Sequence, residues 1–461
     1  MVKIPPHVFR EYDIRGFVDQ DLSPRFAYLL GRAYGSLAKE SKKNRIAVGY
    51  DARHSSPSYA SQLIQGLMDE GIDALATGIG PTPQLYYSIF KYELGGGIMV
   101  TGSHNPPDMN GFKICLGTHT LSGREIQDLY TRMQKLTGKP NENKKGTAAD
   151  LAVKSQYTRE LIDNCLPYFG KRKLKVVADG GNGVGGLVGP QVLRGLGVEV
   201  VELFCNPDGD FPNHHPDPTV LKNLTQLIAK VSETKADFGV AWDGDADRIG
   251  VVDERGRIIY GDMLLLIYAR EILKDIPDAT IIGDVKCSDL LFQTLEKLGA
   301  NPIMWKTGHS LIKDKLKQCK GQLAGEMSAH IFFKHRYFGF DDAIYASARL
   351  CEIMSKSEGC LSDLLKDLPT RISTPEIRVD CPEDLKFSVV KSAQQAFSEF
   401  PTNTIDGVRI TFEKGWGLVR ASNTQPVLVL RFEADTEANL ERYRAIVTDR
   451  ITAIRHQLEN S

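Results

Sequence analysis

The sequence has no long apolar segment, no surplus of charge of either sign and no paired cysteines. No stretch approaches the roughly 18 apolar residues of a membrane-spanning helix, and the N-terminus lacks the apolar segment of a signal peptide. Basic and acidic residues nearly cancel, with a net charge of −1, so no overall excess of positive charge indicates nucleic-acid binding and any partner must be recognised locally. Eight cysteines without a CxxC pair argue for reduced thiols and against a zinc site. We therefore expect a cytoplasmic protein without a membrane or nucleic-acid partner.

The sequence does contain a recurring α/β unit. Apolar strands that end in small polar loops are predicted at Ile46–Asp51, Val176–Asn182 and Thr280–Lys286, and second strands follow at Gly97–Val100, Phe238–Trp242 and Gln322–Ala324. Helical patterns lie between them, and one starts at Ser23-Pro24, an N-cap serine before a proline. This alternation predicts mixed, mostly parallel sheets covered by helices, whose ligands bind at the carboxyl ends of the strands.

The last part of the chain has a different pattern. From about Thr374, predicted strands are followed by a closing helix over Leu440–Gln457, which indicates a small α+β domain with an antiparallel sheet. A chain of 461 residues has room for three or four domains of about 100–200 residues each. We predict α/β domains at 1–150, 151–255 and 256–370, and an α+β domain at 371–461.

The first polar loop, Thr101-Gly-Ser-His-Asn-Pro-Pro107, follows a predicted buried strand. Glycine before Ser103 and two prolines after it hold the serine rigidly exposed, which suits a nucleophile or a phosphate carrier. His104 and the nearby Lys113 offer proton transfer and positive charge for a phosphoryl group. Hydrogen bonding within the loop is an equally good explanation of the Ser-His pair taken alone.

The second polar loop, Asp243-Gly-Asp-Ala-Asp-Arg248, is more specific. Three carboxylates at alternate positions, Asp243, Asp245 and Asp247, direct oxygens toward one point and suit a hard cation such as Mg²⁺. Without a cation the three charges would repel one another. The alternatives are an exposed acidic turn or a calcium loop, but the distal glutamate of a calcium loop is missing at the required position. Arg248 is suited to hold a serine or phosphate at the metal.

The third polar loop, Gly325-Glu-Met-Ser-Ala-His330, combines a carboxylate, a hydroxyl and an imidazole. Glu326 and Ser328 suit the recognition of adjacent sugar hydroxyls, and a purely structural role is the alternative. Further candidates at the same predicted sheet edge are Lys286 and His309. Together these residues predict a sugar-binding region.

The fourth polar segment follows a predicted strand of the last domain. Arg420 offers a fork for phosphate oxygens, and hydroxyl and amide side chains follow it at Ser422, Asn423 and Thr424. A surface turn would explain the last three residues equally well. Near the N-terminus, a charged and aromatic stretch contains Tyr12 and Arg15, which are weaker candidates for the same site.

Taken together, the motifs resemble the α-D-phosphohexomutase superfamily, and within it the bacterial phosphomannomutase/phosphoglucomutase branch. The matching motifs occur in the family's order at Glu11–Gly16, Thr101–Pro107, Asp243–Arg248, Gly325–His330 and Arg420–Thr424. The resemblance implies four domains around a central cleft, with one loop from each domain. It departs at Ala329, where the family usually has glycine.

The resemblance also implies roles for individual residues. Ser103 is then the phosphoserine and, with Asp243, Asp245 and Asp247, a Mg²⁺ ligand. Around the sugar it places Tyr12, Lys286, His309 and the loop that contains Glu326, Ser328 and His330. Around the idle phosphate it places Arg420, Ser422, Asn423 and Thr424. For proton transfer and charge stabilisation it implies Arg15, Lys113 and His309, in addition to Arg248.

The expected activity is a reversible phosphoryl shift between the 1- and 6-positions of glucose or mannose phosphates. It requires Mg²⁺ and passes through a hexose 1,6-bisphosphate, which also serves as activator. The alternatives are a phosphoglucosamine mutase, a Mg²⁺-dependent sugar phosphatase and a non-catalytic sugar-phosphate-binding protein. We expect a monomer or weak dimer, and motion of the last domain while the bisphosphate turns over.

Overall fold

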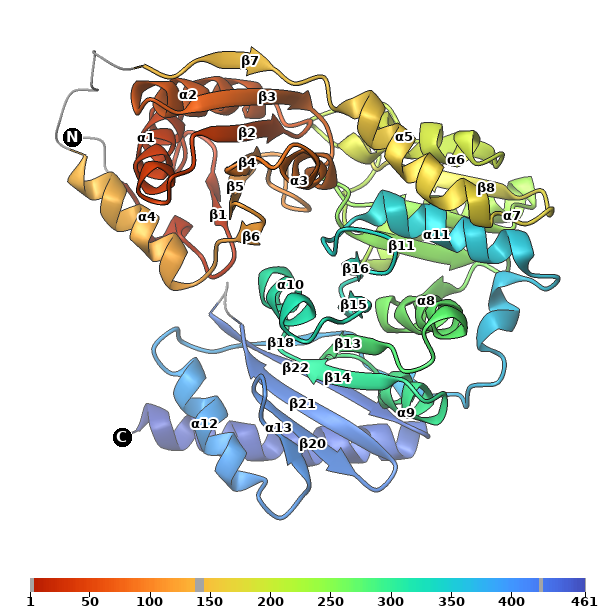
Figure 1. Ribbon diagram of the computed structural model, residues 1–461. Helices are drawn as coiled ribbons and strands as arrows, with labels where there is room; N and C mark the ends of the chain where they lie inside the picture. The colour runs from red at the N-terminus through yellow and green to blue at the C-terminus, as the bar shows by residue number, and fades with distance from the viewer. Residues whose placement is uncertain (1–3, 137–144, 423–425, 461) are drawn as a thin grey trace.

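The computed structural model describes residues 4–136, 145–422 and 426–460, and contains four β-sheets formed by successive parts of the chain (Figure 1). Three of the sheets mix parallel and antiparallel strands and carry helices, and the fourth is antiparallel. The predicted fold class, three α/β domains followed by an α+β domain, is confirmed.

The first sheet has the strand order β1-β5-β4-β2-β3-β7, with β6 paired to β5. Its strands are β1 (Ile14–Phe17), β2 (Arg45–Tyr50), β3 (Asp73–Ile79), β4 (Gly96–Val100), β5 (Met109–Leu116), β6 (His119–Thr120) and β7 (Ala148–Asp150). Its helices are η1 (Pro6–Val8), α1 (Pro24–Glu40), α2 (Ser56–Asp69), α3 (Thr82–Lys91) and α4 (Arg124–Lys135). The predicted start of α1 is confirmed, because Ser23 Oγ accepts a hydrogen bond from the Phe26 N–H at 3.1 Å.

The second sheet has the order β12-β11-β10-β8-β9. Its strands are β8 (Lys175–Asp179), β9 (Glu199–Leu203), β10 (Phe238–Trp242), β11 (Ile249–Asp253) and β12 (Ile258–Ile259). Its helices are α5 (Lys154–Cys165), η2 (Leu166–Tyr168), η3 (Val184–Leu187), α6 (Gly189–Gly195), η4 (Leu221–Leu224) and α7 (Thr225–Thr234). Strand β12 belongs to this sheet although it follows residue 255, and the domain boundaries themselves stay predictions.

The third sheet has the order β14-β13-β15-β16. Its strands are β13 (Thr280–Asp284), β14 (Asn301–Trp305), β15 (Leu323–Gly325) and β16 (Ile331–Phe333). Its helices are α8 (Gly261–Asp275), α9 (Asp289–Lys297), α10 (His309–Gln318), α11 (Ala343–Lys356) and η5 (Leu361–Leu365). Helix α11 packs against α5, α6 and β11, so it ties the third part of the chain to the second.

The fourth sheet has the order β17-β22-β21-β20-β19, with β18 also paired to β22. Its strands are β17 (Ile372–Ser373), β18 (Ile377–Asp380), β19 (Thr402–Asn403), β20 (Val408–Phe412), β21 (Gly415–Ala421) and β22 (Val427–Ala434). Helices α12 (Lys386–Ala396) and α13 (Glu437–Glu459) contact β21. The two-residue strands β17 and β19 are too short to leave a pattern in the sequence.

The first three sheets share one plan that explains where the polar loops lie. In each sheet, one strand pairs parallel with a neighbour on one side and is followed in the chain by an antiparallel strand on its other side. These pairs of consecutive strands are β4 and β5, β10 and β11, and β15 and β16. The turns between them are the loops at Thr101–Pro107, Asp243–Arg248 and Gly325–His330. In the fourth sheet, Arg420 and Ala421 end β21, which pairs antiparallel with β22. The loops therefore lie at the carboxyl ends of strands, as predicted, in connections from strand to strand.

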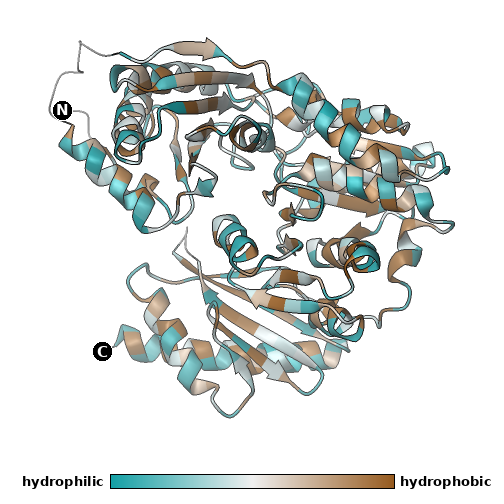
Figure 2. Ribbon diagram, in the orientation of Figure 1, coloured by the Kyte–Doolittle hydropathy of each residue, from teal (hydrophilic) through white to brown (hydrophobic). Residues whose placement is uncertain are grey.

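The apolar core crosses the domain boundaries. One cluster of buried side chains runs from the first to the third part of the chain and includes Met99, Trp242 and Ile344. The fourth part has its own core around its sheet, and a small cluster of Val285, Trp416 and Leu418 joins it to the third. Figure 2 shows apolar residues along the strands of the sheets. Over the ranges described, no helix has the length and apolar character needed to cross a membrane.

Candidate active site

Ser103 lies in the turn between β4 and β5 and is 1% exposed. The expectation of an exposed serine is wrong, because the acidic loop of the second sheet packs against this turn. Its φ of +51° is a left-handed conformation that non-glycine residues seldom adopt, and Thr101 Oγ1 accepts the Ser103 N–H at 2.8 Å. Ser103 Oγ donates to Asp243 Oδ2 at 3.0 Å and lies 3.2 Å from His104 Nδ1. The backbone thus directs the serine hydroxyl toward the acidic loop of the second sheet.

Arg53 holds this turn in place, although the sequence did not single it out. The buried guanidinium donates to the carbonyl oxygens of Ser103 at 2.8 Å, Asn105 at 2.6 Å, and Met109 at 2.8 Å, and also to that of Pro106. Asp51 Oδ2 pairs with Arg53 Nε at 3.2 Å. A signal was present, because Asp51 ends the strand predicted at residues 46–51 and a polar loop follows at the same edge of the sheet.

The three aspartates converge as their spacing predicted. Asp243, Asp245 and Asp247 are fully buried, and one carboxylate oxygen from each lies within 4.8 Å of the others. The acidic loop and the serine loop are in close contact at Gly244. A Cβ atom at this position would lie 2.4 Å from the Ser103 carbonyl oxygen, so only glycine fits there. Asp243 Oδ1 accepts the N–H groups of Asp247 at 3.0 Å and Arg248 at 3.1 Å.

This donor set fits Mg²⁺. Buried Oδ1 atoms of Asp245 and Asp247 have no hydrogen-bond partner within the described ranges, and uncompensated carboxylate oxygens are the ligands a hard cation takes. Thr82 Oγ1 donates to Asp245 Oδ2 at 2.5 Å and orients that carboxylate from α3. Burial, with Asp245 and Asp247 nearby, raises the pKa of Asp243, which is the repulsion expected of clustered carboxylates.

Lys113, on β5, supplies positive charge at the same point. Its Nζ donates to Asp245 Oδ2 at 2.6 Å and also to Asp247 Oδ2. Burial alone would lower the pKa of Lys113, but the aspartates raise it above its usual range, so the lysine is an ammonium. Arg15 reaches the serine loop from β1, where its Nη1 donates to Asn105 Oδ1 at 3.2 Å. Both residues therefore border the serine and its aspartates.

The loop between β15 and β16 meets the acidic loop through a histidine. Arg248 Nε donates to His330 Nε2 at 2.9 Å, and His330 Nδ1 lies 3.2 Å from Asp341 Oδ2. Glu326 Oε1 accepts the Gly308 N–H at 2.6 Å, and Ser328 is half-buried nearby in the loop. The loop thus joins the two regions that the sequence assigned to metal and sugar.

Ala329 has a φ of +67°, in the left-handed region where a Cβ atom is disfavoured and glycine is favoured. Its N–H donates to the Glu326 carbonyl oxygen at 2.9 Å, so the turn closes with alanine at this position.

His309 begins α10 and stacks on His330, with ring centroids 5.6 Å apart. Tyr12 lies edge-on to His309 at 6.0 Å, and its hydroxyl donates to the Thr307 carbonyl oxygen at 3.0 Å. Neither ring nitrogen of His309 has a hydrogen-bond partner within the described ranges. Burial, together with Lys313, lowers the pKa of His309, which keeps the ring neutral.

The positive groups of the third and fourth parts also lie close together. Lys286 Nζ donates to Glu376 Oε1 at 2.8 Å, and Arg420 Nε donates to Asp406 Oδ2 at 3.1 Å. Thr307 connects this region to the N-terminal segment, because its carbonyl oxygen accepts the Tyr12 hydroxyl at 3.0 Å and its N–H donates to Asp406 Oδ2 at 3.1 Å. Ser422 is buried at the end of β21, and the predicted phosphate ligands Asn423 and Thr424 lie outside the described residues.

A buried polar contact fixes this region to the third sheet. Arg409 donates to the carbonyl oxygens of Val285 and Cys287, and Arg431 donates to that of Lys286. Ser288 Oγ donates to Glu433 Oε1 at 2.9 Å. The backbone on both sides of Lys286 is thus held by the fourth sheet.

Sequence reasoning missed a set of supporting residues that act on the candidate side chains. They are Arg53, Thr82, Lys313, Asp341, Glu376 and Asp406. Most of them lie far along the chain from the residues they act on, such as Thr82 from Asp245 and Glu376 from Lys286, whereas Lys313 is one helical turn from His309 in α10. Apart from Arg53, which follows a predicted strand end, they stand outside any pattern that signals such a contact.

Comparison with known proteins gives the same four-part division. Models described as phosphoglucomutase/phosphomannomutase alpha/beta/alpha domains I, II and III match residues 6–139, 155–256 and 260–372, and the C-terminal domain model matches 376–450. A protein of Pseudomonas syringae pv. tomato named phosphomannomutase/phosphoglucomutase is 48% identical over 447 residues, which cover 96% of this chain and 94% of that protein. A Neisseria meningitidis phosphoglucomutase is 46% identical, with 96% of each chain covered.

The fold has a solved counterpart as well. The crystal structure of a phosphoglucomutase/phosphomannomutase family protein from Burkholderia thailandensis matches with a TM-score of 0.92 and 40% identity, covering 98% of both chains. Because the family models match in order along most of the sequence and the relatives align over nearly its whole length, this chain belongs to the phosphoglucomutase/phosphomannomutase family.

Proposed function

We propose that this enzyme interconverts the 1- and 6-phosphates of glucose and of mannose. Family membership and the names of relatives nearly half identical over almost the whole chain support the reaction. The observation that carries the proposal is the buried Ser103 hydroxyl, 3.0 Å from Asp243 within a cluster of three aspartates. A hydroxyl so placed is suited to carry a phosphoryl group beside a divalent cation.

In the proposed reaction, phosphorylated Ser103 transfers its phosphoryl group to the free hydroxyl of a sugar phosphate. The bond from Ser103 Oγ to phosphorus breaks, a bond from the sugar oxygen to phosphorus forms, and the hydroxyl proton leaves to a base. The product is a hexose 1,6-bisphosphate. After the bisphosphate reverses its orientation, its other phosphoryl group returns to Ser103 and the isomeric monophosphate is released.

The chain's own residues would position and neutralise the transferring group. Asp243, Asp245 and Asp247 would hold Mg²⁺ with Ser103, and the cation would supply Lewis-acid stabilisation of phosphoryl oxygens. Lys113, which stays an ammonium beside the aspartates, would offset the negative charge that develops on the phosphoryl group. Arg248, fixed against His330, would do so from the other side.

Proton transfer and sugar binding are assigned mainly to residues of the third and fourth parts of the chain. Within the described ranges neither ring nitrogen of His309 has a hydrogen-bond partner, and its pKa is lowered, so a neutral imidazole is available to accept the hydroxyl proton. Arg15 and Lys113, the other candidates from the sequence, carry positive charge and are assigned to charge stabilisation instead. Glu326 and Ser328 are proposed to bind adjacent sugar hydroxyls, and Arg420 to hold the phosphate that is not transferred. Glucose and mannose differ at the 2-hydroxyl, so one set of contacts at the 3- and 4-hydroxyls serves both sugars.

Ser103→Ala is the direct test. We expect it to abolish interconversion of glucose 1- and 6-phosphate in the presence of Mg²⁺ and glucose 1,6-bisphosphate, with circular dichroism unchanged. Ser58→Ala, an exposed serine of α2, is the matched control and should retain full activity. Full activity of Ser103→Ala would refute the phosphoserine. Release of inorganic phosphate by the wild-type enzyme at the rate of substrate consumption would favour a phosphatase.

A further inference from the structure

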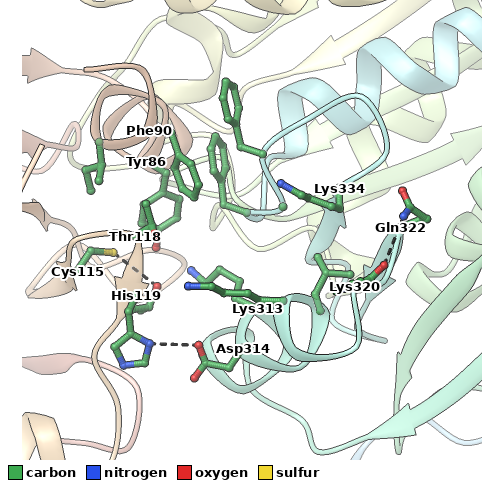
Figure 3. A pocket seen from close by; sticks show the side chains of 17 residues that line it. Tyr86, Phe90, Cys115, Thr118, His119, Lys313, Asp314, Lys320, Gln322 and Lys334 are labelled. Carbon is green, nitrogen blue, oxygen red and sulfur yellow. Dashed lines mark hydrogen bonds and ion pairs between the residues drawn. The ribbon is translucent and has the colours of Figure 1, made fainter. Parts of the chain in front are cut away.

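A cavity lies between the first and third parts of the chain. Its volume is about 320 Å³, and none of the candidate active-site residues lines it. Helix α3 and the β5–β6 turn form one wall, and α10 with the segment at residues 334–340 forms the other (Figure 3). Small-molecule sites commonly lie at such domain interfaces and start at about this size.

The apolar part of the cavity is built from aromatic rings. Tyr86 and Phe90 come from α3, and Phe338 and Phe340 come from the opposite wall. Tyr86 lies 5.5 Å from Phe340, and Phe90 lies 5.5 Å from Phe338, measured between ring centroids. The rings of Phe338 and Phe340 are nearly parallel, at 2°. These rings pack against one another across the interface, and Lys313 Nζ lies 4.3 Å from the centroid of the Tyr86 ring. The apolar ring surface left along the cavity suits a flat, apolar group.

The polar part of the cavity carries an excess of positive charge. Four lysines line it: Lys313, Lys317, Lys320 and Lys334. The lining has one carboxylate, Asp314, whose Oδ1 is already 3.1 Å from His119 Nδ1 across the interface. Lys313 pairs with Asp341 at 3.2 Å, whereas the other three lysines have no carboxylate partner within the described ranges. Three of these lysines are exposed at the edge of the cavity, so the cavity has a positive potential that favours anions.

We propose that this cavity binds a nucleoside phosphate. An aromatic base matches the rings of α3 and of the segment at 334–340, and a di- or triphosphate matches several lysine ammoniums at once. A sugar phosphate lacks the flat apolar face that these rings would cover. The proposal does not depend on the proposed mutase activity, because no residue to which a catalytic, metal-binding or substrate-binding role is assigned lines the cavity. Lys313, which pairs with Asp341 beside His330, borders both sites.

The test is calorimetric titration of the full chain with adenosine diphosphate in the presence of Mg²⁺. Saturating glucose 1,6-bisphosphate is included in a second titration to occupy the candidate active site. We expect one site per chain whose dissociation constant changes less than twofold with the bisphosphate. Adenosine and pyrophosphate, the two halves of the probe, should each bind at least tenfold more weakly than the whole nucleotide.

Two residues of α10 provide a matched pair of variants. Lys317→Glu reverses a charge in the cavity and should weaken adenosine diphosphate binding at least tenfold. Lys315→Glu makes the same charge change two residues away, on a side chain that covers Trp305 instead, and should change binding less than twofold. Phe338→Leu keeps an apolar side chain but removes a ring. It should weaken the binding of the nucleotide while leaving the binding of pyrophosphate unchanged.

Two binding results would overturn the proposal: no binding at 1 mM nucleotide, on the order of the weakest affinities that matter for a ligand of this size, or displacement of the nucleotide by glucose 1,6-bisphosphate. Two comparisons would also overturn it: pyrophosphate binding as tightly as the nucleotide, or equal effects of the Lys317 and Lys315 variants on nucleotide binding. Each would be informative whether or not Ser103→Ala abolishes mutase activity, so failure of this site and failure of the proposed function are separable.

Discussion

Arg53 offers a sharp test of how the serine turn is held. Its guanidinium is 1% exposed and binds four carbonyl oxygens between Ser103 and Met109, and it packs against Gly102, where a side chain would lie 2.4 Å from Arg53 Nε. Replacing it with alanine removes all these donors at once. It also removes the cation paired with the buried Asp51 carboxylate, which keeps the hydrogen bonds from the Ser56 hydroxyl and the Gly102 N–H.

The cost follows from those contacts. A hydrogen bond to a charged group contributes about 1.5–3 kcal/mol, so four bonds total about 6–12 kcal/mol before relaxation. Water entering the vacated space would satisfy part of the carbonyl groups, and bonds made by one side chain are not additive. We therefore expect Arg53→Ala to lower the free energy of unfolding by about 3–5 kcal/mol, as for one partner removed from a buried ion pair.

The catalytic effect comes from position. A displacement of about 1 Å at a reacting group costs about 100-fold in rate, so we expect kcat to fall by about that factor, with a smaller change in KM. The assay is the coupled formation of glucose 6-phosphate from glucose 1-phosphate, together with urea unfolding and limited proteolysis of the turn. Arg53→Lys keeps the charge without the planar guanidinium, so its kcat and its stability should lie between those of the wild type and of Arg53→Ala.

The control is Arg25→Ala, which removes a guanidinium that lies over Tyr28 at the start of α1. Its stability and kcat should change little. If Arg53→Ala retained kcat within threefold and lost less than about 1 kcal/mol, which is the typical effect of a point substitution, Arg53 would not be holding the serine turn.

Three further changes test other features. Lys235→Gly should stabilise the protein by about 0.5–1 kcal/mol in urea unfolding, because the exposed Lys235 ends α7 at a φ of +51°; a loss of stability would contradict this. The Asp314 carboxylate raises the pKa of His119 to about 9, so protonated His119 stabilises the folded state fully below about pH 6.5 and loses this effect as pH rises through about 9. His119→Asn should remove this contribution to the free energy of unfolding, so its stability difference from wild type should shrink over that pH interval. Thr82→Val should raise the Mg²⁺ concentration for half-maximal activity about tenfold, because the Asp245 carboxylate loses a donor; an unchanged titration would rule out that role.

The arrangement of the loops could be predicted because each lies within a local pattern. The alternation in Asp243–Arg248 brings three carboxylates together at the end of β10, and strand alternation places Ser103 at an equivalent edge. What the sequence does not reveal is that each loop turns into an antiparallel strand. Short strands such as β16 have only three residues, too few for a periodic pattern.

Contacts over long distances in the chain could not be predicted. Asp341 approaches His309 and His330, and Arg53 binds the turn that starts 50 residues later, through side chains that stand outside any motif. Their roles depend on how helices and turns pack against one another. A single sequence contains the residues of such contacts, but it does not contain the pairing.

The buried contact between the third and fourth sheets has a consequence for dividing this gene. A shortened chain ending near residue 370 would lose the arginines that bind the carbonyl oxygens around Lys286, and would expose Val285 where Trp416 and Leu418 now cover it. The truncated product would be an incomplete folding unit, although its three α/β domains would be whole in sequence. Conversely, a substitution of Arg409 should displace the backbone around Lys286, in the neighbouring domain, because Arg409 binds the carbonyl oxygens on both sides of that residue.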